Sequence, residues 1–232
     1  MHCVIAVSAM AGPASQIRPG RAGIFEAGRT DAVRQLIGSG PGNGQVLQLM
    51  TDVLVLCTAN VCRSVMTAAL LTRRLVSVGA TASVRSAGML GEGQPAAAEV
   101  SSVLAARGID VGAHRSRRAS REDLAAADLV LTMTREQLRY AVVTAPAVWP
   151  RAFTLKELVR RGQATGPRSP GQPLADWISL AHDGRYRHGL LGDDPADDVA
   201  DPIGGPPEGF AITAGQLDHL LGHLVTLAWG RQ

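Results

Sequence analysis

Residues 53–64 read VLVLCTANVCRS. The first four are aliphatic, which is typical of a strand that is buried on both faces of a parallel sheet. Cys57 ends this aliphatic run, Arg63 stands six positions later, and Ser64 follows it directly. Five residues between Cys57 and Arg63 are enough for the backbone to turn once around a tetrahedral oxyanion, with successive N–H groups pointing inward. The stretch therefore predicts an anion-binding loop that contains a nucleophile.

The residues after the loop predict a helix. Ala, Leu and Val recur at helical spacing over residues 64–78, so the positive N-terminal end of a helix is expected behind a bound anion. A thiol beside such an end and an arginine reacts as a thiolate, which makes Cys57 the candidate nucleophile. The planar fork of Arg63 can hold two phosphate oxygens at once. The simpler alternative is that Cys57 and Cys62 are small hydrophobic residues at the end of a strand.

Strands and helices alternate along the rest of the chain. The sequence predicts strands at residues 53–56, 83–86 and 129–133 and near Ala152. It predicts helices at residues 65–78, 96–107, 121–126, 154–161 and 208–229, and one more helix between residue 133 and Ala152. This order predicts the α/β class: a single-domain open parallel sheet of about four strands, with helices on both faces and the phosphate loop after the first strand.

Two segments stand apart from this pattern. Residues 1–49 contain scattered Gly and Pro and one helical candidate at 26–37, so they are expected to be a disordered extension or to precede the true start at Met50. The domain is expected to span residues 50–232. Within it, residues 162–200 are rich in Gly, Pro and Asp and are expected to form a long surface loop with a short helical candidate at 175–181.

The composition is that of an ordinary soluble protein, with 46% hydrophobic and 19% charged residues. Lys156 is the one lysine among 23 basic residues, a bias typical of a GC-rich bacterial genome. A net charge of +3 is too small to indicate nucleic acid, and no apolar run is long enough to predict a membrane span. Three cysteines make no disulfide framework, and a thiolate nucleophile favours a reducing compartment, so we expect the cytoplasm.

A thiolate that attacks a phosphate ester also needs a proton donor for the leaving oxygen. Two Asp-Pro pairs compete for this role, one at Asp194 and one at Asp201, and both lie in an acidic stretch whose carboxylates could equally be solvated. We favour Asp201, because Pro202 and the following glycines allow a tight turn that can aim a carboxyl group.

These motifs resemble the low-molecular-weight protein tyrosine phosphatase family, which shares its fold with thiol-linked arsenate reductases. Residues 57–64 are similar to its phosphate loop, and Asp201-Pro202 with Gly204-Gly205 is similar to its acid loop. Between them, in family order, stand Ser86-Ala87-Gly88, Gly108-Ile109-Asp110, His114-Arg115 and residues 127–133. The resemblance covers most of residues 52–229.

The resemblance implies a role for each matched residue. Cys57 would be the nucleophile, Arg63 the phosphate clamp, and Asp201 the acid and later the base. Substrate would be bound by the rest of the loop, namely Thr58, Ala59, Asn60, Val61, Cys62 and Ser64. Asn60 would hold the strained backbone and Ser64 would stabilise the thiolate, with Ser86 and His114 completing a supporting network. Cys62 would pair with Cys57 in a reversible protective disulfide.

The implied activity is hydrolysis of phosphate monoesters through a phosphocysteine, without a metal or other cofactor. The implied partner is a phosphotyrosine protein or a small aryl phosphate. Ala59 stands where the family usually has Gly, and a positive φ there would cost about 1 kcal/mol. Leu90 and Ile203 stand where many members carry the aromatic residues that grip a phenyl ring.

Two alternative functions remain open. An arsenate reductase would use the same thiolate, but that branch relays oxidation through further cysteines and none follows Cys62, so it would need an external thiol. A non-catalytic phosphate- or phosphoprotein-binding module would keep the loop and lose turnover. The presence of Cys57, Arg63 and Asp201 together argues against such a module.

Overall fold

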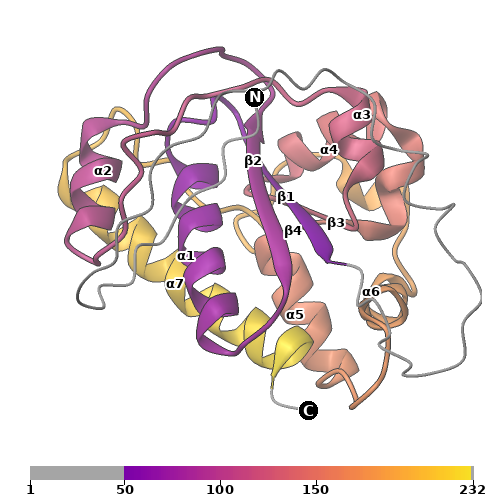
Figure 1. The fold of residues 1–232 in the computed structure, drawn as a ribbon. Helices are drawn as coiled ribbons and strands as arrows, with labels where there is room; N and C mark the ends of the chain where they lie inside the picture. The colour runs from indigo at the N-terminus through magenta and orange to yellow at the C-terminus, as the bar shows by residue number, and fades with distance from the viewer. Residues whose placement is uncertain (1–49, 231–232) are drawn as a thin grey trace, which may run out of the picture. The chain divides into compact units, whose positions relative to one another are not determined.

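A four-stranded parallel sheet forms the centre of the domain in the computed structural model, which describes residues 50–230 (Figure 1). Its strands are β1 (Thr51–Cys57), β2 (Ala82–Gly88), β3 (Leu129–Thr132) and β4 (Ala152–Thr154). They pair in the order β2-β1-β3-β4, with every neighbouring pair parallel. The predictions for residues 1–49, including the helical candidate at 26–37, lie outside the described residues.

The helices follow the predicted order. They are α1 (Arg63–Ser77), α2 (Ala98–Ala105), α3 (Arg121–Ala126), α4 (Arg135–Thr144), α5 (Leu155–Thr165), α6 (Leu174–His182) and α7 (Glu208–Trp229). Two short 3₁₀ helices, η1 (Pro146–Arg151) and η2 (Arg187–Leu190), lie between them. Among the described residues, no helix is both long and apolar enough to cross a lipid bilayer.

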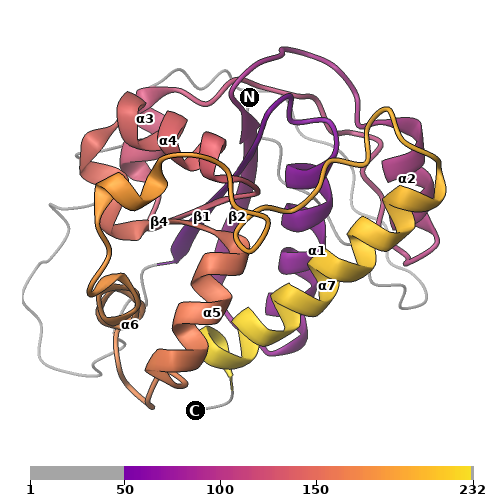
Figure 2. The ribbon, with the colours of Figure 1, turned by 180° about the vertical axis from the view of Figure 1, so that it is seen from behind.

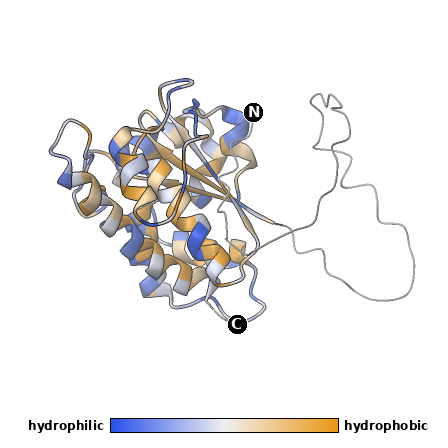
Figure 3. Cartoon of the chain, turned by 60° about the vertical axis from the view of Figure 1, so that its left-hand side comes forward, coloured by the Kyte–Doolittle hydropathy of each residue, from blue (hydrophilic) through white to orange (hydrophobic). Residues whose placement is uncertain are grey.

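The sheet is buried on both faces because each strand sends alternate side chains to opposite sides. In β1, Val53 and Val55 pack into a core with α1, α5 and α7, while Leu54 and Leu56 pack into a second core with α3 and α4. Figure 2 shows α7 running across α1 and ending beside α5. In Figure 3 the strands are coloured as hydrophobic, whereas the helices carry both hydrophobic and hydrophilic residues. The predicted α/β fold with helices on both faces is therefore confirmed.

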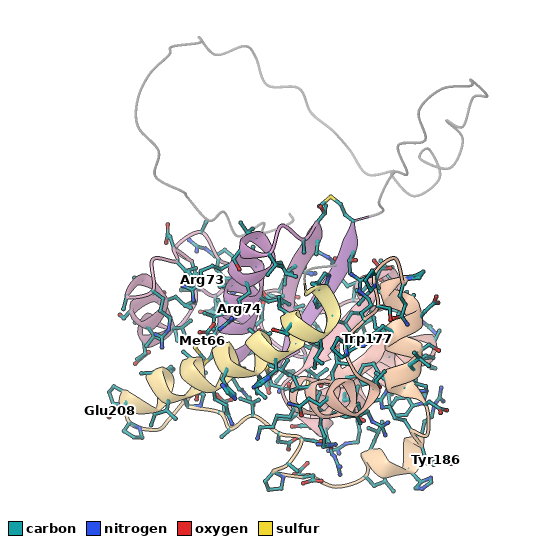
Figure 4. All side chains as sticks on the ribbon, turned by 90° about the horizontal axis from the view of Figure 1, so that it is seen from below. Met66, Arg73, Arg74, Trp177, Tyr186 and Glu208 are labelled. Carbon is teal, nitrogen blue, oxygen red and sulfur yellow. The ribbon has the colours of Figure 1, made fainter. Side chains whose placement is uncertain are left out.

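An ion pair on the solvent side fastens α7 to α1. Arg74 Nε donates to the Asp218 carboxylate at 2.8 Å, and the Arg73 guanidinium lies 3.8 Å from the same oxygen. Figure 4 shows Arg73 and Arg74 together on α1, close to α7. The helix that carries the anion loop is thus held both by its buried apolar face and by this surface contact.

Residues 162–200 are more regular than the long surface loop that the sequence predicts. They include the end of α5, all of α6 and all of η2, and α6 confirms the short helical candidate at 175–181. Helix α6 is held because Trp177, Ile178 and Ala181 are buried against the core. After it, Arg185 is 8% exposed, lies between the rings of Trp149 and Phe153, and pairs with Glu157 at 2.8 Å. High Gly, Pro and Asp content therefore does not mean that this segment is loosely packed.

Candidate active site

The loop between β1 and α1 places a thiol and a guanidinium together. β1 ends at Cys57 and α1 begins at Arg63, so residues 58–62 connect a strand directly to a helix N-terminus. Cys57 is 3% exposed and Arg63 is 5% exposed. Both therefore lie largely out of water at the carboxyl end of the sheet, where open α/β sheets bind their ligands.

The neighbouring strand β2 supports this loop at a position that admits only glycine. Gly88 pairs with Cys57 in the sheet, and the Leu90 N–H donates to the Thr58 carbonyl oxygen at 2.8 Å. A Cβ on Gly88 would lie 2.7 Å from the carbonyl oxygens of both Thr58 and Leu90. Because those oxygens belong to the backbone, any side chain at Gly88 would push the loop away from β2.

Two polar groups approach the sulfur of Cys57. The Ser64 hydroxyl oxygen lies 2.9 Å from Sγ, and the backbone N–H of Asn60 donates to Sγ at 3.3 Å. Hydrogen bonds to the charged form of an acid stabilise that form. Both contacts are therefore placed to stabilise negative charge that develops on the Cys57 sulfur during a reaction.

Asn60 carries the backbone strain of the loop. Its φ is 56°, and it is the one residue other than glycine with a positive φ among residues 50–230. Asn tolerates this conformation better than most residues because its short polar side chain can hydrogen-bond locally. Ala59 does not adopt a positive φ, so the strain that a missing glycine would bring at that position does not arise.

The side chain and carbonyl of Asn60 are fixed from four directions. Its amide nitrogen donates to Ser86 Oγ at 2.9 Å and to Ser64 Oγ at 3.0 Å. Its amide oxygen accepts from the Arg117 backbone N–H at 3.0 Å, and its carbonyl oxygen lies 2.7 Å from Nε2 of His114. The loop conformation is therefore imposed by groups from three separate parts of the chain.

Arg63 already engages the C-terminal part of the chain. Its Nη1 donates to the Val199 carbonyl oxygen at 3.1 Å, and its Nη2 forms an ion pair with the Asp201 carboxylate. Its Nε–H is buried and finds no acceptor among the described residues. A buried donor without a partner costs about 1–3 kcal/mol, so this N–H is a place where an oxyanion in the loop would be stabilising.

The structure separates the two candidate acids. The Asp201 carboxylate reaches Arg63, and its side chain remains 40% exposed. The Asp194 carboxylate instead accepts from Arg135 at 2.9 Å and from the backbone N–H of Ala196. Of the two, only Asp201 contacts a residue of the anion loop.

Cys62 is buried against the loop and is 2% exposed. Burial, with the negative charges of Asp201 and Cys57 adding to it, raises the pKa of the Cys62 thiol to about 12. Cys62 is therefore a neutral thiol at physiological pH. Both Cys57 and Cys62 are free, so the disulfide that the resemblance implies is not formed in this structure.

Sequence reasoning missed Gln137 and Val199. Gln137 is 1% exposed, donates to the Thr58 hydroxyl at 3.3 Å and accepts from the Met133 N–H at 2.8 Å. The pattern Thr134-x-x-Gln137 is a capping box, so the sequence does contain a local signal for its position. Val199 accepts a hydrogen bond from Arg63 through its backbone carbonyl oxygen, and no sequence pattern predicts such a backbone contact.

The site thus combines two hydrogen-bonded groups that the β1–α1 loop brings together. One contains the Cys57 thiol with Ser64 and Asn60, and the other contains the Arg63 guanidinium with the Asp201 carboxylate. The predicted site residues that belong to the site are Cys57, Asn60, Arg63, Ser64, Ser86, His114 and Asp201. Across residues 50–230, no three His, Cys, Asp or Glu side chains gather in a group that could hold a metal ion. These groups can supply a nucleophile, an anion clamp and a proton donor.

The buried imidazole of His114 predicts a pH-dependent stability. Burial lowers the pKa of His114 below its ordinary 6.5, and this outweighs the hydrogen bond to Asn60. The unfolded chain therefore binds the proton first, so the free energy of unfolding falls as the pH drops through about 6.5. Replacing His114 with Gln, which keeps a donor for Asn60, should remove this part of the pH dependence.

Urea unfolding of the wild type and His114→Gln at about pH 7.5 and about pH 5.5 measures the effect. The wild type should lose more stability than the variant between the two values. His188→Gln alters an exposed imidazole and should retain the wild-type pH dependence. Equal losses in the wild type and His114→Gln would contradict the assignment.

Comparison with known proteins identifies the family. The family described as "Low molecular weight phosphotyrosine protein phosphatase" matches residues 52–165. A protein-arginine-phosphatase from Geobacillus stearothermophilus is 32% identical over 174 residues, which cover 74% of this chain and 92% of that protein. The probable low molecular weight protein-tyrosine-phosphatase EpsP from Ralstonia solanacearum is 35% identical over 47% of this chain and 74% of its own length.

The fold agrees with solved structures of the same group. The crystal structure of a low molecular weight protein tyrosine phosphatase from T. tengcongensis matches with a TM-score of 0.58 and 31% identity, over 75% of this chain and 97% of that one. The similarity to this phosphatase and to the one from Geobacillus stearothermophilus extends along nearly their whole length. This chain belongs to the low molecular weight phosphotyrosine protein phosphatase family.

Proposed function

We propose that this protein hydrolyses phosphate monoesters through a phosphocysteine at Cys57, with protein phosphotyrosine as the principal substrate and small aryl phosphates as further substrates. One observation carries the proposal: the buried, unpaired Nε–H of Arg63 belongs to the loop that also holds the Cys57 sulfur. Phosphate oxygens can satisfy that donor, and we expect backbone N–H groups of residues 58–62 to donate to the same oxygens.

In the first step, the Cys57 thiolate attacks phosphorus and the bond from phosphorus to the ester oxygen breaks. Arg63 and the loop amides neutralise the three phosphoryl oxygens as charge develops on them. Protonated Asp201 gives its proton to the leaving oxygen, so a neutral phenol departs and a carboxylate remains. The first step thus leaves a phosphocysteine at Cys57.

In the second step, the Asp201 carboxylate takes a proton from water as the water oxygen attacks phosphorus. The sulfur–phosphorus bond breaks, inorganic phosphate forms and the Cys57 thiolate is restored. The Ser64 hydroxyl, 2.9 Å from Sγ, donates to the departing thiolate. Ser64 would therefore help the second step, in which sulfur is the leaving group.

Aliphatic side chains at the mouth of the site bear on substrate choice. Leu90 is 58% exposed and stands two residues after Gly88, the last residue of β2, while Ile203 is 48% exposed and follows Asp201-Pro202. Both offer apolar surface without the ring stacking that an aromatic wall would supply. Binding of a phenyl ring would depend on area burial and on contacts with the rest of the phosphoprotein.

The relative from Geobacillus stearothermophilus favours a second candidate, protein phosphoarginine. The same thiolate, clamp and acid could break a phosphorus–nitrogen bond, with Asp201 protonating the leaving guanidine nitrogen. The aliphatic residues Leu90 and Ile203 fit an alkyl guanidine as well as they fit a phenyl ring.

Arsenate reduction and phosphate binding without turnover find less support. A cysteine relay for arsenate reduction needs a further thiol, and Cys57 and Cys62 are the free cysteines among the described residues. A binding module without turnover would not require a carboxylate at Arg63, yet Asp201 lies there. A free thiolate nucleophile would persist in a reducing compartment, so we propose the cytoplasm as the location.

Substitution of three residues tests the mechanism with phenyl phosphate near about pH 6. Cys57→Ser should abolish turnover. Asp201→Ala should lower kcat/KM by about 10²- to 10⁴-fold, because the phenolate then leaves without a proton. Asp194→Ala, which alters the rival acid, should have a much smaller effect. Retention of turnover in Cys57→Ser would refute the phosphocysteine mechanism.

Paired peptides that differ only in the modified residue decide between the two substrates. We expect a higher kcat/KM for the phosphotyrosine peptide than for the phosphoarginine peptide. Ile203→Tyr should raise the value for phosphotyrosine by about 2- to 10-fold through ring stacking. Ile212→Tyr, at a 71% exposed position on α7, should leave it unchanged. A clear preference for phosphoarginine would establish the second candidate instead.

A further inference from the structure

The acidic stretch before Asp201 is not a solvated loop. We name residues 194–201 the acid strap. Asp197, within it, is only 4% exposed. Its carboxylate accepts from Arg135 Nε at 2.8 Å and from Arg160 Nη1 at 2.7 Å. A buried carboxylate held by two arginines fixes the backbone around it, so the middle of the strap has a defined position.

The residues on either side of Asp197 are fastened as well. Asp198 accepts through its side chain from the backbone N–H of Arg135 at 2.8 Å, at the start of α4. Lys156 on α5 donates to the carbonyl oxygens of Pro195, at 2.9 Å, and of Asp198. Two helices, α4 and α5, therefore hold the strap in place.

The strap then passes directly into the active site. The Val199 N–H donates to the carbonyl oxygen of Met133, just after β3, at 2.8 Å. The Val199 carbonyl oxygen accepts from Arg63, and two residues later Asp201 pairs with the same guanidinium. Asp201 thus follows the buried Asp197 by only four positions in the chain.

We propose that Arg135, acting through the buried carboxylate of Asp197, is a positioning residue that aims Asp201 at the leaving group of the substrate. The inference rests on the proposed function, in which Asp201 is the proton donor. A proton donor must lie within hydrogen-bond reach of the leaving oxygen, and small misplacements cost rate. Arg135 therefore supports the step in which the leaving group departs.

The ion pairs of Asp197 with Arg135 and Arg160 are retained under acidic assay conditions. Burial opposes ionisation of Asp197, but hydrogen bonds from Arg160 and Arg135 outweigh it and lower the pKa of this carboxyl below its ordinary value. The Asp197 carboxylate therefore stays charged at the pH of the aryl phosphatase assay, and Arg135 and Arg160 continue to hold the strap at that pH.

Helix α4 offers a matched control one turn away. Arg139 also reaches toward the segment before Asp201, but it bonds the Leu190 and Gly192 carbonyl oxygens at 2.7 Å and the exposed Asp193. None of these contacts involves the acid strap. Arg139→Gln thus removes an arginine of comparable structural importance from the same helix without touching the residues that lead to Asp201.

The test compares kcat/KM for two substrates, because kcat/KM reports formation of the phosphocysteine. Phenyl phosphate needs protonation of its leaving group, whereas dinitrophenyl phosphate has a phenolate that departs without a proton. Arg135→Gln should lower the value for phenyl phosphate by about tenfold, a part of the full general-acid effect, and change it little for dinitrophenyl phosphate. Arg139→Gln should leave the ratio of the two values at the wild-type level.

Several results would overturn the inference. An equal loss on both substrates in Arg135→Gln, or the same change of ratio in Arg139→Gln, would show a merely structural role. Arg160 is the outer of the two arginines that bind Asp197, and the Arg160 side chain is 54% exposed. Arg160→Gln should therefore shift the ratio of the two kcat/KM values in the same direction as Arg135→Gln, but by less. If Arg135→Gln does not fold, this milder variant decides, and an unchanged ratio in it refutes the inference.

Asp201→Ala in the same assay separates this inference from the proposed function. If the ratio of the two kcat/KM values changes strongly in Asp201→Ala but not in Arg135→Gln, the positioning role of Arg135 is refuted and the proposed function stands. No change of ratio in Asp201→Ala refutes Asp201 as the acid, and the positioning role with it.

Discussion

The structure depends on a backbone that must turn once around an anion between a strand and a helix. That turn forces Asn60 to a φ of 56°, a conformation that a single residue does not maintain without support. Ser86, Ser64, His114 and the Arg117 backbone supply the support through hydrogen bonds. Much of the domain is thus arranged to keep five loop residues in one shape.

Distant segments of the chain converge on Arg63. The guanidinium lies at the start of α1, yet its protein partners are Val199 and Asp201, 136 and 138 residues further along the chain. The strap that carries these partners is held by α4 and α5, so helices outside the anion loop set the position of Asp201, the proposed acid. In the proposed mechanism, Arg63 would also bind phosphate oxygens, so the same guanidinium would contact both the substrate and the segment that carries Asp201.

Elements whose bounds are set by neighbouring residues can be predicted from the sequence. Contacts between residues that are distant in the chain cannot. Helix α3 begins and ends where predicted because Ser120 caps it through a capping box, and α7 does so because its apolar face is continuous. The loop was predictable because a strand, a nucleophile and a helix are contiguous there. The anchoring of Asp197 was not, since its arginine partners lie 62 and 37 residues away.

Direct observation of phosphate on the protein during turnover tests the central claim. The enzyme would be mixed with an aryl phosphate, quenched in acid within the first turnover, digested and analysed by mass spectrometry. The account predicts a phosphoryl group on the sulfur of Cys57, in the peptide that contains residues 57–63. Turnover with no modified peptide at any quench time, or with phosphate on a different side chain, would contradict it.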